Sequence, residues 1–340
     1  MASQFTFSCA CVTTAVMLGC SSWRDTSSAD EIAQGSSRQT RAQVEWALDS
    51  EIGGTSKLYP SVSFRGAIAG SGLGAAKARW KKSIFISDSN NLYQFDRNGA
   101  LLSTLADGTC AKGLDADKSG NLYASNCHGF VYVYAPGNSV PSYRLFDNGG
   151  TAWSVAVCPN GNIFVGNFQQ ESGPGDVAEF AGGQRSPTGV VPLTDAYNVF
   201  GVACDDNSVL WISYDDQDSG MHIAAFDGTT VTDYGSLGIA FVGAVRVTGT
   251  GDLVVASQPS QSNPNPSVEF FNSEKLAAGP YLTISVPDVS GFSLIPSLKD
   301  IWVADADAVE FNLRGKVRSQ IGGGIVVGAF DVYAFPPGNT

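Results

Sequence analysis

The densest group of potential metal ligands in this chain is an acidic run, Asp215-Asp216-Gln217-Asp218-Ser219-Gly220. Carboxylate oxygens at alternating positions, followed by a glycine that permits a sharp turn, suit calcium. The run lacks the distal bidentate glutamate of an EF-hand loop. Two interpretations stay open. The run is a solvated surface loop, which the acidic composition of the chain favours, or Asp215, Asp216 and Asp218 form a calcium site.

Catalytic patterns are sparse elsewhere in the chain. Neither of the two histidines, His128 and His222, has the neighbouring residues that a zinc site or a general base requires. The Gly-x-Ser-x-Gly elbow of serine hydrolases is absent. Gly70-Ser71-Gly72 imitates a dinucleotide fingerprint, but the segment after it is too short for the helix of a βαβ unit. The sequence therefore names no catalytic residue.

The cysteines indicate an oxidising compartment. Four of the seven, Cys110, Cys127, Cys158 and Cys204, follow residue 100, and an even number fits a disulfide framework. Cys110 and Cys127 lie at one end of a predicted hairpin, so we expect a disulfide between them. Cys158 and Cys204 lie at the same end of strands in neighbouring repeats. A second disulfide is predicted there, although a one-residue offset between the two strands argues against it.

The N-terminus resembles a bacterial lipoprotein signal. An apolar run ends in Met17-Leu18-Gly19-Cys20, is too short for a membrane span and has the length of a signal core. No Lys or Arg precedes it, so a buried or disordered N-terminus is the alternative. We expect residues 1–19 to be a signal peptide, Cys20 to be lipidated and the protein to lie in the bacterial cell envelope, on a periplasmic or extracellular face. The Ser, Gly and Ala of residues 20–80 favour a flexible tether.

Residues 81–340 repeat one pattern six times. An apolar strand core recurs at residues 84–87, 122–125, 163–166, 210–213, 253–256 and 301–304. The copies start 38, 41, 47, 43 and 48 residues apart, which is the period of β-propeller blades. A second strand follows each copy, at residues 92–95, 131–134, 177–180, 223–226, 268–270 and 309–311.

An innermost strand precedes most of these cores. The expected segments are residues 113–117, 154–158, 201–205, 244–248 and 292–296, joined to the cores by turns rich in Gly, Asn and Asp. The first core lacks a convincing copy upstream, and residues 326–330 at the chain end supply a better one. We therefore predict an all-β, six-bladed propeller whose C-terminal strand joins the N-terminal blade, which removes exposed sheet edges.

The charge of the chain limits its partners. The formal net charge is −12, with 20 Lys and Arg against 32 Asp and Glu. Nucleic acids and anionic membrane surfaces require a basic patch, so neither is an expected partner, and a membrane would be reached only through a lipid anchor. The expected partner is a protein or a small-molecule ligand. Asp115 and Arg246 share one column of the innermost strands, where we expect a structural salt link.

Three long loops indicate where a ligand would bind. They cover residues 167–176, 215–220 and 257–267, connect equivalent strands of three successive blades and should leave the ring on one rim. Aromatic residues that precede the innermost strands should edge the same mouth, either for recognition or for packing between blades. The candidate ligand-binding residues are Trp153, Gln170, Glu171, Tyr197, Asn198, Tyr214 and Phe241.

The repeat motifs carry a family resemblance. Gly113-Leu114-Asp115-Ala116-Asp117, followed by Gly120-Asn121-Leu122-Tyr123-Ala124-Ser125, is similar to the repeats of NHL and SMP-30-like six-bladed propellers. The resemblance implies the fold more than a function. Enzymes of the SMP-30 type hold a divalent metal with Glu, Asn and Asp, and this chain offers chiefly Asn198 at the corresponding places. We expect a binding or interaction module, with a metal-dependent hydrolase, lactonase or lyase as the alternative.

Overall fold

The structure is a computed structural model that describes residue 80 and residues 83–147, 151–168, 175–182, 184–218, 220–259, 264–295, 300–326 and 328–335. All of them belong to one compact unit, Tyr59–Thr340. The described residues form strands and one short 3₁₀ helix, η2 (Leu276–Ala278). No helix in this part of the chain is long and apolar enough to span a membrane. Cys20, Gln170 and Glu171 lie outside the described residues.

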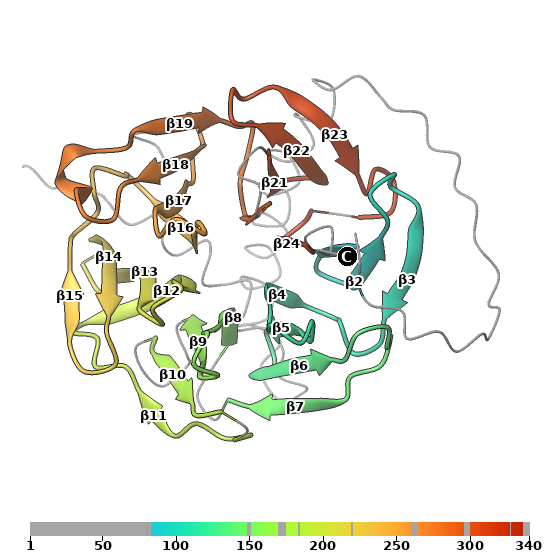
Figure 1. The fold of residues 1–340 in the computed structure, drawn as a ribbon, viewed down its shortest axis with the longest axis horizontal. Helices are drawn as coiled ribbons and strands as arrows, with labels where there is room; N and C mark the ends of the chain where they lie inside the picture. Colours follow the sequence, from blue (N-terminus) through green and yellow to red (C-terminus); the bar gives the residue numbers. More distant parts are fainter. Residues whose placement is uncertain are drawn as a thin grey trace, which may run out of the picture. The chain divides into compact units, whose positions relative to one another are not determined.

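Six four-stranded antiparallel sheets are arranged as the blades of a β-propeller (Figure 1). Blade 1 contains β24 (Asp331–Ala334), β1 (Ile84–Ser87), β2 (Leu92–Phe95) and β3 (Leu101–Leu105). Blade 2 contains β4 (Ala111–Ala116), β5 (Leu122–Asn126), β6 (Phe130–Tyr134) and β7 (Tyr143–Phe146). Blade 3 contains β8 (Thr151–Val157), β9 (Ile163–Phe168), β10 (Val177–Phe180) and β11 (Gly189–Val190).

The second half of the ring repeats this order. Blade 4 contains β12 (Ala196–Cys204), β13 (Leu210–Asp216), β14 (Met221–Phe226) and β15 (Val231–Asp233). Blade 5 contains β16 (Val242–Val247), β17 (Leu253–Ser257), β18 (Ser267–Phe271) and β19 (Leu282–Ser285). Blade 6 contains β20 (Gly291–Leu294), β21 (Asp300–Ala304), β22 (Ala308–Asn312) and β23 (Val317–Ile321). The predicted fold class and both repeated strand columns are confirmed.

The C-terminal strand closes the ring as predicted, but a different segment forms it. β24 pairs antiparallel with β1 and places Asp331 opposite Ser87 and Ala334 opposite Ile84. The expected segment, residues 326–330, instead leads into this strand, and Phe330 donates its backbone N–H to the Ser87 carbonyl. The prediction was based on apolar residues. The innermost strand of blade 1 instead begins at the polar Asp331, whose side chain has hydrogen-bond partners in other blades.

The second strand of each blade is the most buried. All residues of β1, β5, β9, β17 and β21 are buried. A strand in the middle of a blade packs against neighbouring blades on both faces, so it reads as a nearly continuous apolar run. The apolar clusters accordingly draw from pairs of adjacent blades; one of them joins Phe164 of blade 3 to Ile212 and Phe226 of blade 4.

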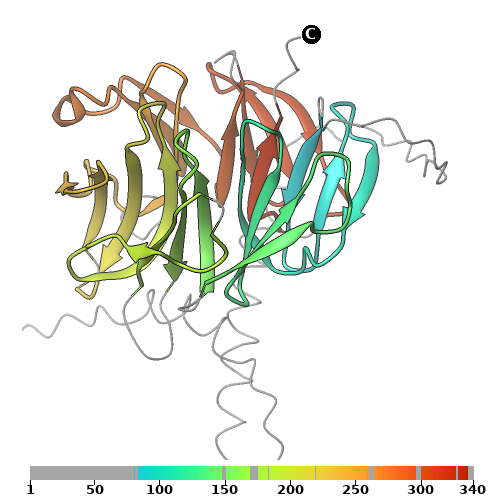
Figure 2. The same ribbon diagram turned by 60° about the horizontal axis from the view of Figure 1, so that its bottom comes forward.

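The two ends of the ring carry different connections, because all strands within a blade are antiparallel. One end, here called the turn end, carries the connections from first to second and from third to fourth strand. The other end, here called the mouth, carries the connections from second to third strand and those between blades. Figure 2 shows the blades from the side, with the strands seen along their length. The described ends of the three long loops leave their strands at the mouth, as predicted.

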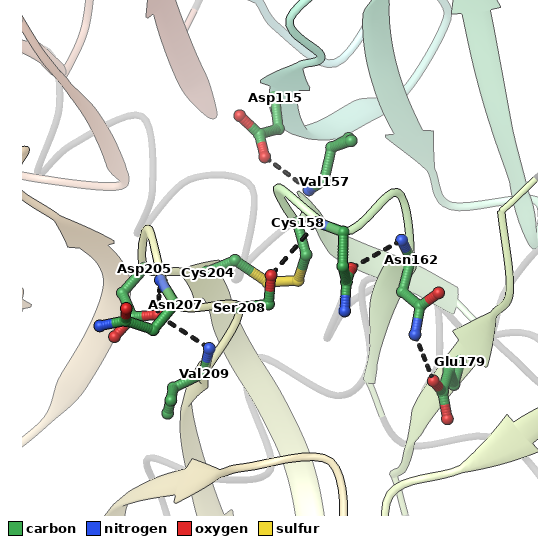
Figure 3. Close-up of a disulfide and its surroundings, with 11 residues drawn as sticks. Asp115, Val157, Cys158, Asn162, Glu179, Cys204, Asp205, Asn207, Ser208 and Val209 are labelled. Atoms are coloured by element: carbon green, nitrogen blue, oxygen red, sulfur yellow. Dashed lines mark hydrogen bonds between the residues drawn. A yellow bond between two sulfur atoms is a disulfide. The ribbon is translucent and has the colours of Figure 1, made fainter.

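Both predicted disulfides are present, one at each end of the ring. Cys110 and Cys127 are joined at the mouth within blade 2, with a Cα–Cα distance of 5.7 Å. Cys158 and Cys204 are joined at the turn end, where they connect blades 3 and 4 (Figure 3), with a Cα–Cα distance of 5.2 Å. The one-residue offset is present, because Cys204 pairs with Leu210 whereas Val157, the residue before Cys158, holds the equivalent pairing with Ile163. It does not separate the two cysteines, because Cys158 follows the last paired residue of β8.

Candidate functional site

The mouth is built from one equivalent position on, or directly before, each innermost strand. The strand registers align Phe330, Lys112, Trp153 and Phe200 in blades 1 to 4, and Gly243 and Ser290 in blades 5 and 6. We call these six residues the mouth layer. Four consecutive blades therefore contribute a large side chain and the remaining two contribute small residues.

The next position along each strand is small in five of the six blades, which brings the blades close together, and in blade 1 it is Asp331. These residues are Asp331, Gly113, Ser154, Gly201, Ala244 and Gly291. A Cβ on Gly113 would lie 2.7 Å from the Cα of Ser154, and one on Gly201 would lie 2.7 Å from the backbone nitrogen of Val245. Neighbouring backbones occupy the space that a side chain would need, so this layer fixes the spacing of the mouth residues above it.

Side chains of the mouth form a continuous arc across five blades. The Lys112 ammonium lies 3.2 Å from the ring centroid of Phe330 and 4.9 Å from that of Trp153. Trp153 packs against Phe168 at 4.7 Å, Phe168 against Phe200 at 5.8 Å and Phe200 against Phe241 at 5.1 Å between centroids. We call these six residues the aromatic arc.

The arc combines packing with exposed surface. Phe168 and Phe200 are buried, whereas Trp153, Phe241, Phe330 and Lys112 keep part of their surface exposed. The two interpretations of the mouth aromatics are therefore compatible, because the buried rings pack between blades and hold the partly exposed ones in place. A rigid, partly exposed aromatic surface is suited to a ligand with an apolar face.

An ion pair spans the centre of the ring below the mouth. Arg246, on the innermost strand of blade 5, donates from Nη2 to Asp331 Oδ2 of blade 1 at 2.8 Å and to the Leu114 carbonyl of blade 2 at 3.2 Å. Asp331 Oδ2 also accepts the Leu114 backbone N–H at 2.8 Å. Burial raises the pKa of Asp331, and the Arg246 guanidinium opposes that shift. The pair ties the closing strand β24 to two other blades.

Asp115 faces the same central space without a direct ion pair to Arg246 among the described contacts. Its carboxylate accepts the backbone N–H of Val157 in blade 3 at 2.7 Å and that of Ala116 at 2.8 Å. Burial raises the pKa of Asp115 to about 6, although the charge of Arg246 opposes the shift. The predicted salt link of Arg246 therefore exists, but its partner is Asp331. In blade 6 this column holds Ser293, not Leu294.

The acidic loop of blade 4 turns its carboxylates in different directions. Asp215 is buried and accepts the backbone N–H of Asn198 at 2.8 Å and its side-chain amide at 3.1 Å. Burial raises the pKa of Asp215 to about 6. Asp216 instead accepts the backbone N–H groups of Asp218 and Gly220, at 2.9 and 2.7 Å. Among the described residues no group of three or more His, Cys, Asp or Glu is arranged to hold a metal.

His222 links this loop to the outer strand of blade 4. Its Nε2 lies 3.1 Å from Asp216 Oδ2 and its Nδ1 lies 2.8 Å from Asp233 Oδ2. The imidazole stacks on the buried Tyr214 ring at 4.8 Å. Partial burial alone would lower the pKa of His222, but the hydrogen bonds and charges of the Asp216 and Asp233 carboxylates outweigh it and raise the pKa. The cluster stabilises the base of the loop, which explains the local concentration of charge.

A second acidic group lies at the mouth in blade 6. Asp305 is buried and accepts a short hydrogen bond from the backbone N–H of Ala306. Burial raises the pKa of Asp305 to about 7, and the nearby charges of Asp288 and Asp307 add to the increase. Asp307 accepts a hydrogen bond from Gln320 Nε2 at 2.7 Å.

The structure brings only some of the sequence-predicted ligand residues together. Trp153 and Phe241 belong to the aromatic arc, and Tyr197 lies in the mouth-side part of β12, where its carbonyl accepts the Gly175 N–H. Asn198 points inward to Asp215, and Tyr214 stacks on His222 within blade 4. Phe292, the first residue of the innermost strand predicted in blade 6, is fully buried two positions beyond the mouth layer.

Sequence reasoning missed Lys112, Phe168, Phe200 and Phe330. Lys112 and Phe200 precede the small residues Gly113 and Gly201, so a search for the residue before each small innermost position would have found these two. That search needs the strand registers, because β-bulges shift the alignment of the innermost strands.

Comparisons with known proteins support the fold and leave the function open. No protein-family model and no curated protein matches this chain. Its fold is similar to that of hydrazine synthase from Kuenenia stuttgartiensis, with a TM-score of 0.51 and 13% identity over 74% of this chain and 80% of that chain. It is also similar to a protein of unknown function from Bacteroides caccae, with a TM-score of 0.55 and 13% identity over 75% of this chain and 98% of that chain. At this identity the chain shares the propeller fold with both.

Proposed function

We propose that this protein is an exported binding module that takes its ligand at the mouth of the propeller. The observation that carries the proposal is the mouth layer, in which four consecutive blades present Phe330, Lys112, Trp153 and Phe200 at one equivalent position. The small residues beneath hold these side chains in fixed positions, so a ligand would meet a preorganised surface. The long loops that leave the same end extend this surface, as ligand-binding loops on rigid scaffolds do.

The disulfides support an oxidising, extracytoplasmic location. Disulfides persist where thiols are not kept reduced, and this propeller contains two. Together with the signal-like N-terminus they favour export and a lipid anchor on Cys20. Mass spectrometry of the mature N-terminus tests this part of the proposal; a chain that still begins with Met1 after expression in a bacterial host would contradict it.

A ligand screen with mouth variants tests the binding function. The purified protein is screened by thermal shift against metabolites, oligosaccharides and peptides, and hits are measured again with Trp153→Ala/Phe241→Ala. Tyr234→Ala/Tyr281→Ala is the matched control, because both tyrosines are exposed and lie outside the arc. The proposal expects binding that the mouth variant loses and the control keeps. Hits that the mouth variant binds equally well would contradict the proposal, and turnover of a lactone panel would favour the metal-dependent enzyme.

A further inference from the structure

We infer that the mouth takes a basic segment of a partner protein, whose Lys and Arg side chains meet the carboxylates of the mouth and whose apolar side chains lie on the aromatic arc. The inference rests on the proposed function and specifies the partner class for that site. Three observations carry it: the unequal charge of the two ends of the ring, the dispersion of the carboxylates around the mouth, and buried oxygen atoms without a donor beside the long loops.

The negative charge of the described connections is concentrated at the mouth. The described connections at this end carry nine aspartates and no Lys or Arg. The described connections at the turn end carry seven acidic and six basic residues. The turn end is therefore close to neutral in charge, whereas the mouth is strongly negative. Such an asymmetry attracts a cationic partner to the mouth and repels an anionic one from it.

Charged groups at the ends of the strands do not reverse this imbalance. Lys112 adds one positive charge, Asp215 adds a further carboxylate, and His222 lies between two more. Burial raises the pKa of Asp305 to about 7 and that of Asp307 above its ordinary value. With both of these counted as protonated, seven aspartates of the mouth connections remain against the one ammonium. The sign of the mouth therefore does not depend on any single group being unpaired.

The carboxylates of the mouth are spread around the ring. Six of the nine aspartates are exposed or partly exposed, namely Asp107, Asp176, Asp195, Asp218, Asp288 and Asp307. Among the described residues no group of three or more His, Cys, Asp or Glu is arranged to hold a metal ion. A single small cation meets few of these carboxylates, because charge interactions are screened beyond about 8 Å at physiological ionic strength. A segment with several positive charges meets more of them at once, so the dispersion favours a basic protein segment over a small amine.

The aromatic arc provides surface for the rest of such a segment. The Lys112 ammonium lies on the faces of Phe330 and Trp153, which shows that these rings accept a cation of the kind that the partner brings. Phe241 is partly exposed and lies at the other end of the arc, away from this ammonium. Aromatic side chains and the alkyl stems of Lys and Arg pack well on such rings.

Two buried oxygen atoms beside the long loops have no hydrogen-bond partner. They are Asn167 Oδ1, near the mouth end of β9, and Ser257 Oγ, at the mouth end of β17, and both residues are 0% exposed. Asn167 donates from Nδ2 to Asp176 Oδ1 at 2.7 Å, so its Oδ1 is the atom left without a donor. An unsatisfied buried polar atom is costly, and ammonium and guanidinium groups carry donors only. A basic partner therefore supplies the kind of group that these two positions lack.

Three hexapeptide amides test the inference by isothermal titration calorimetry on the full chain. Their pattern is X-Phe-X-X-Phe-X, in which X is Lys, Gln or Glu, so they share two aromatic residues and differ in charge. At about 50 mM NaCl the Lys peptide should bind at least about tenfold more tightly than the Gln peptide, and the Glu peptide should bind most weakly.

A triple variant locates the interaction at the mouth. Asp107→Asn/Asp195→Asn/Asp218→Asn removes three exposed carboxylates of the mouth connections. Asp107 and Asp195 have φ values of +59° and +58°, which Asn adopts readily, so the loops should keep their conformation. The variant should reduce the preference for the Lys peptide over the Gln peptide to less than about threefold.

A second triple variant is the matched control. Asp206→Asn/Asp227→Asn/Glu274→Gln removes three exposed carboxylates of the turn end and changes the net charge of the chain equally. It should leave the preference for the Lys peptide unchanged. A control that loses this preference as fully as the mouth variant would overturn the mouth as the place of the interaction.

Different outcomes separate this inference from the proposed function. Equal binding of the three peptides that Trp153→Ala/Phe241→Ala abolishes would overturn the basic partner and leave the mouth as a binding site. Binding of 3-phenylpropylamine as tight as that of the Lys peptide would overturn the protein segment in favour of a small amine. If none of the peptides binds, the inference is wrong, whereas the proposed function is still decided by its own ligand screen.

A salt titration covers the case in which the mouth variant does not fold. The natural chain is then measured at about 50 and about 500 mM NaCl, and the inference requires that the salt weaken binding of the Lys peptide and leave that of the Gln peptide unchanged. Binding of the Lys peptide that does not respond to salt would overturn the inference.

Discussion

The same strands form both ends of the ring, but the residues at the two ends differ in how much they vary between blades. At the turn end, one device recurs in three blades: a side-chain oxygen at the start of the turn accepts a backbone N–H further along it. Asp117, Asp205 and Thr248 each do this. In blade 3 the equivalent position is Cys158, and Asn160, two residues further on, accepts the N–H of Asn162. At the mouth, the equivalent positions differ from blade to blade, from Phe330 and Lys112 to Gly243 and Ser290. The turn end uses a recurrent device because it only reverses the direction of the chain. The residues at the mouth differ in size and charge from blade to blade, as those of a recognition surface do.

The disulfides provide the strongest test of this comparison. Cys158–Cys204 closes a segment with a sequence separation of 46 at the turn end, and Cys110–Cys127 closes one of 17 at the mouth. The stabilisation from loop closure increases with separation, so replacing both cysteines by serine should cost about 4 kcal/mol at the turn end and about 3 kcal/mol at the mouth. Urea denaturation of the two double variants measures both costs. A larger loss for the mouth pair would show that the connection between blades 3 and 4 matters less than we infer.

Glycine substitutions compare the two ends at the level of the backbone. Gly201→Ala places a methyl group 2.7 Å from the Val245 nitrogen and 3.0 Å from the Ala244 Cα, which are both backbone atoms of the next blade. Because backbones cannot rotate away as side chains do, we expect a loss of about 3 kcal/mol. Gly161→Ala, at the turn end, meets nothing within 4 Å but holds a φ of +91°, so its expected cost is about 1 kcal/mol. Equal losses in thermal or urea unfolding would argue against close blade contact beneath the mouth.

Two carboxylates, one at each end of the ring, should contribute to the pH dependence of stability with opposite signs. Burial raises the pKa of Asp305 at the mouth from 3.8 to about 7, so the folded chain holds this proton more tightly than the unfolded chain. Its contribution to stability is present below pH 4 and is lost as the pH rises from about 4 to 7. Backbone N–H groups of Thr230 and Thr229 lower the pKa of Asp227 at the turn end, so its contribution is present above pH 4 and is lost on acidification.

Single substitutions reveal these opposite contributions. Asp305→Asn should flatten the decrease in melting temperature between pH 5 and pH 8, because the variant no longer ionises at the buried site. Asp227→Asn should leave that interval unchanged and reduce the dependence below pH 4. Asp115 and Asp215, with pKa values raised to about 6, act in the same direction as Asp305. A natural chain whose melting temperature rises from pH 5 to pH 8 would contradict the predicted sign.

The fold was more predictable than the site because the two depend on different properties of the sequence. The second strand of each blade is buried on both faces, so its apolar run is visible in the sequence without any partner. The innermost strands are harder to locate in the sequence. Their side chains contact the two neighbouring blades in turn, and they include the charged residues Asp115, Arg246 and Asp331. For this reason the prediction of the closing strand was wrong by five residues, at 326–330 in place of Asp331–Ala334.

The sequence by itself determined the six-bladed ring, its closure by the chain end, the pairing of Cys110 with Cys127 and the end from which the long loops emerge. These features follow from periodicity and strand direction, which are local. Only the tertiary structure decided that Arg246 pairs with Asp331, that Cys158 reaches Cys204, and that Phe330, Lys112, Trp153 and Phe200 share one layer. These contacts join different blades, and register shifts in β4, β8, β12 and β16 change the side-chain phase at the mouth layer. The sequence pattern of a single repeat does not reveal this change of side-chain phase.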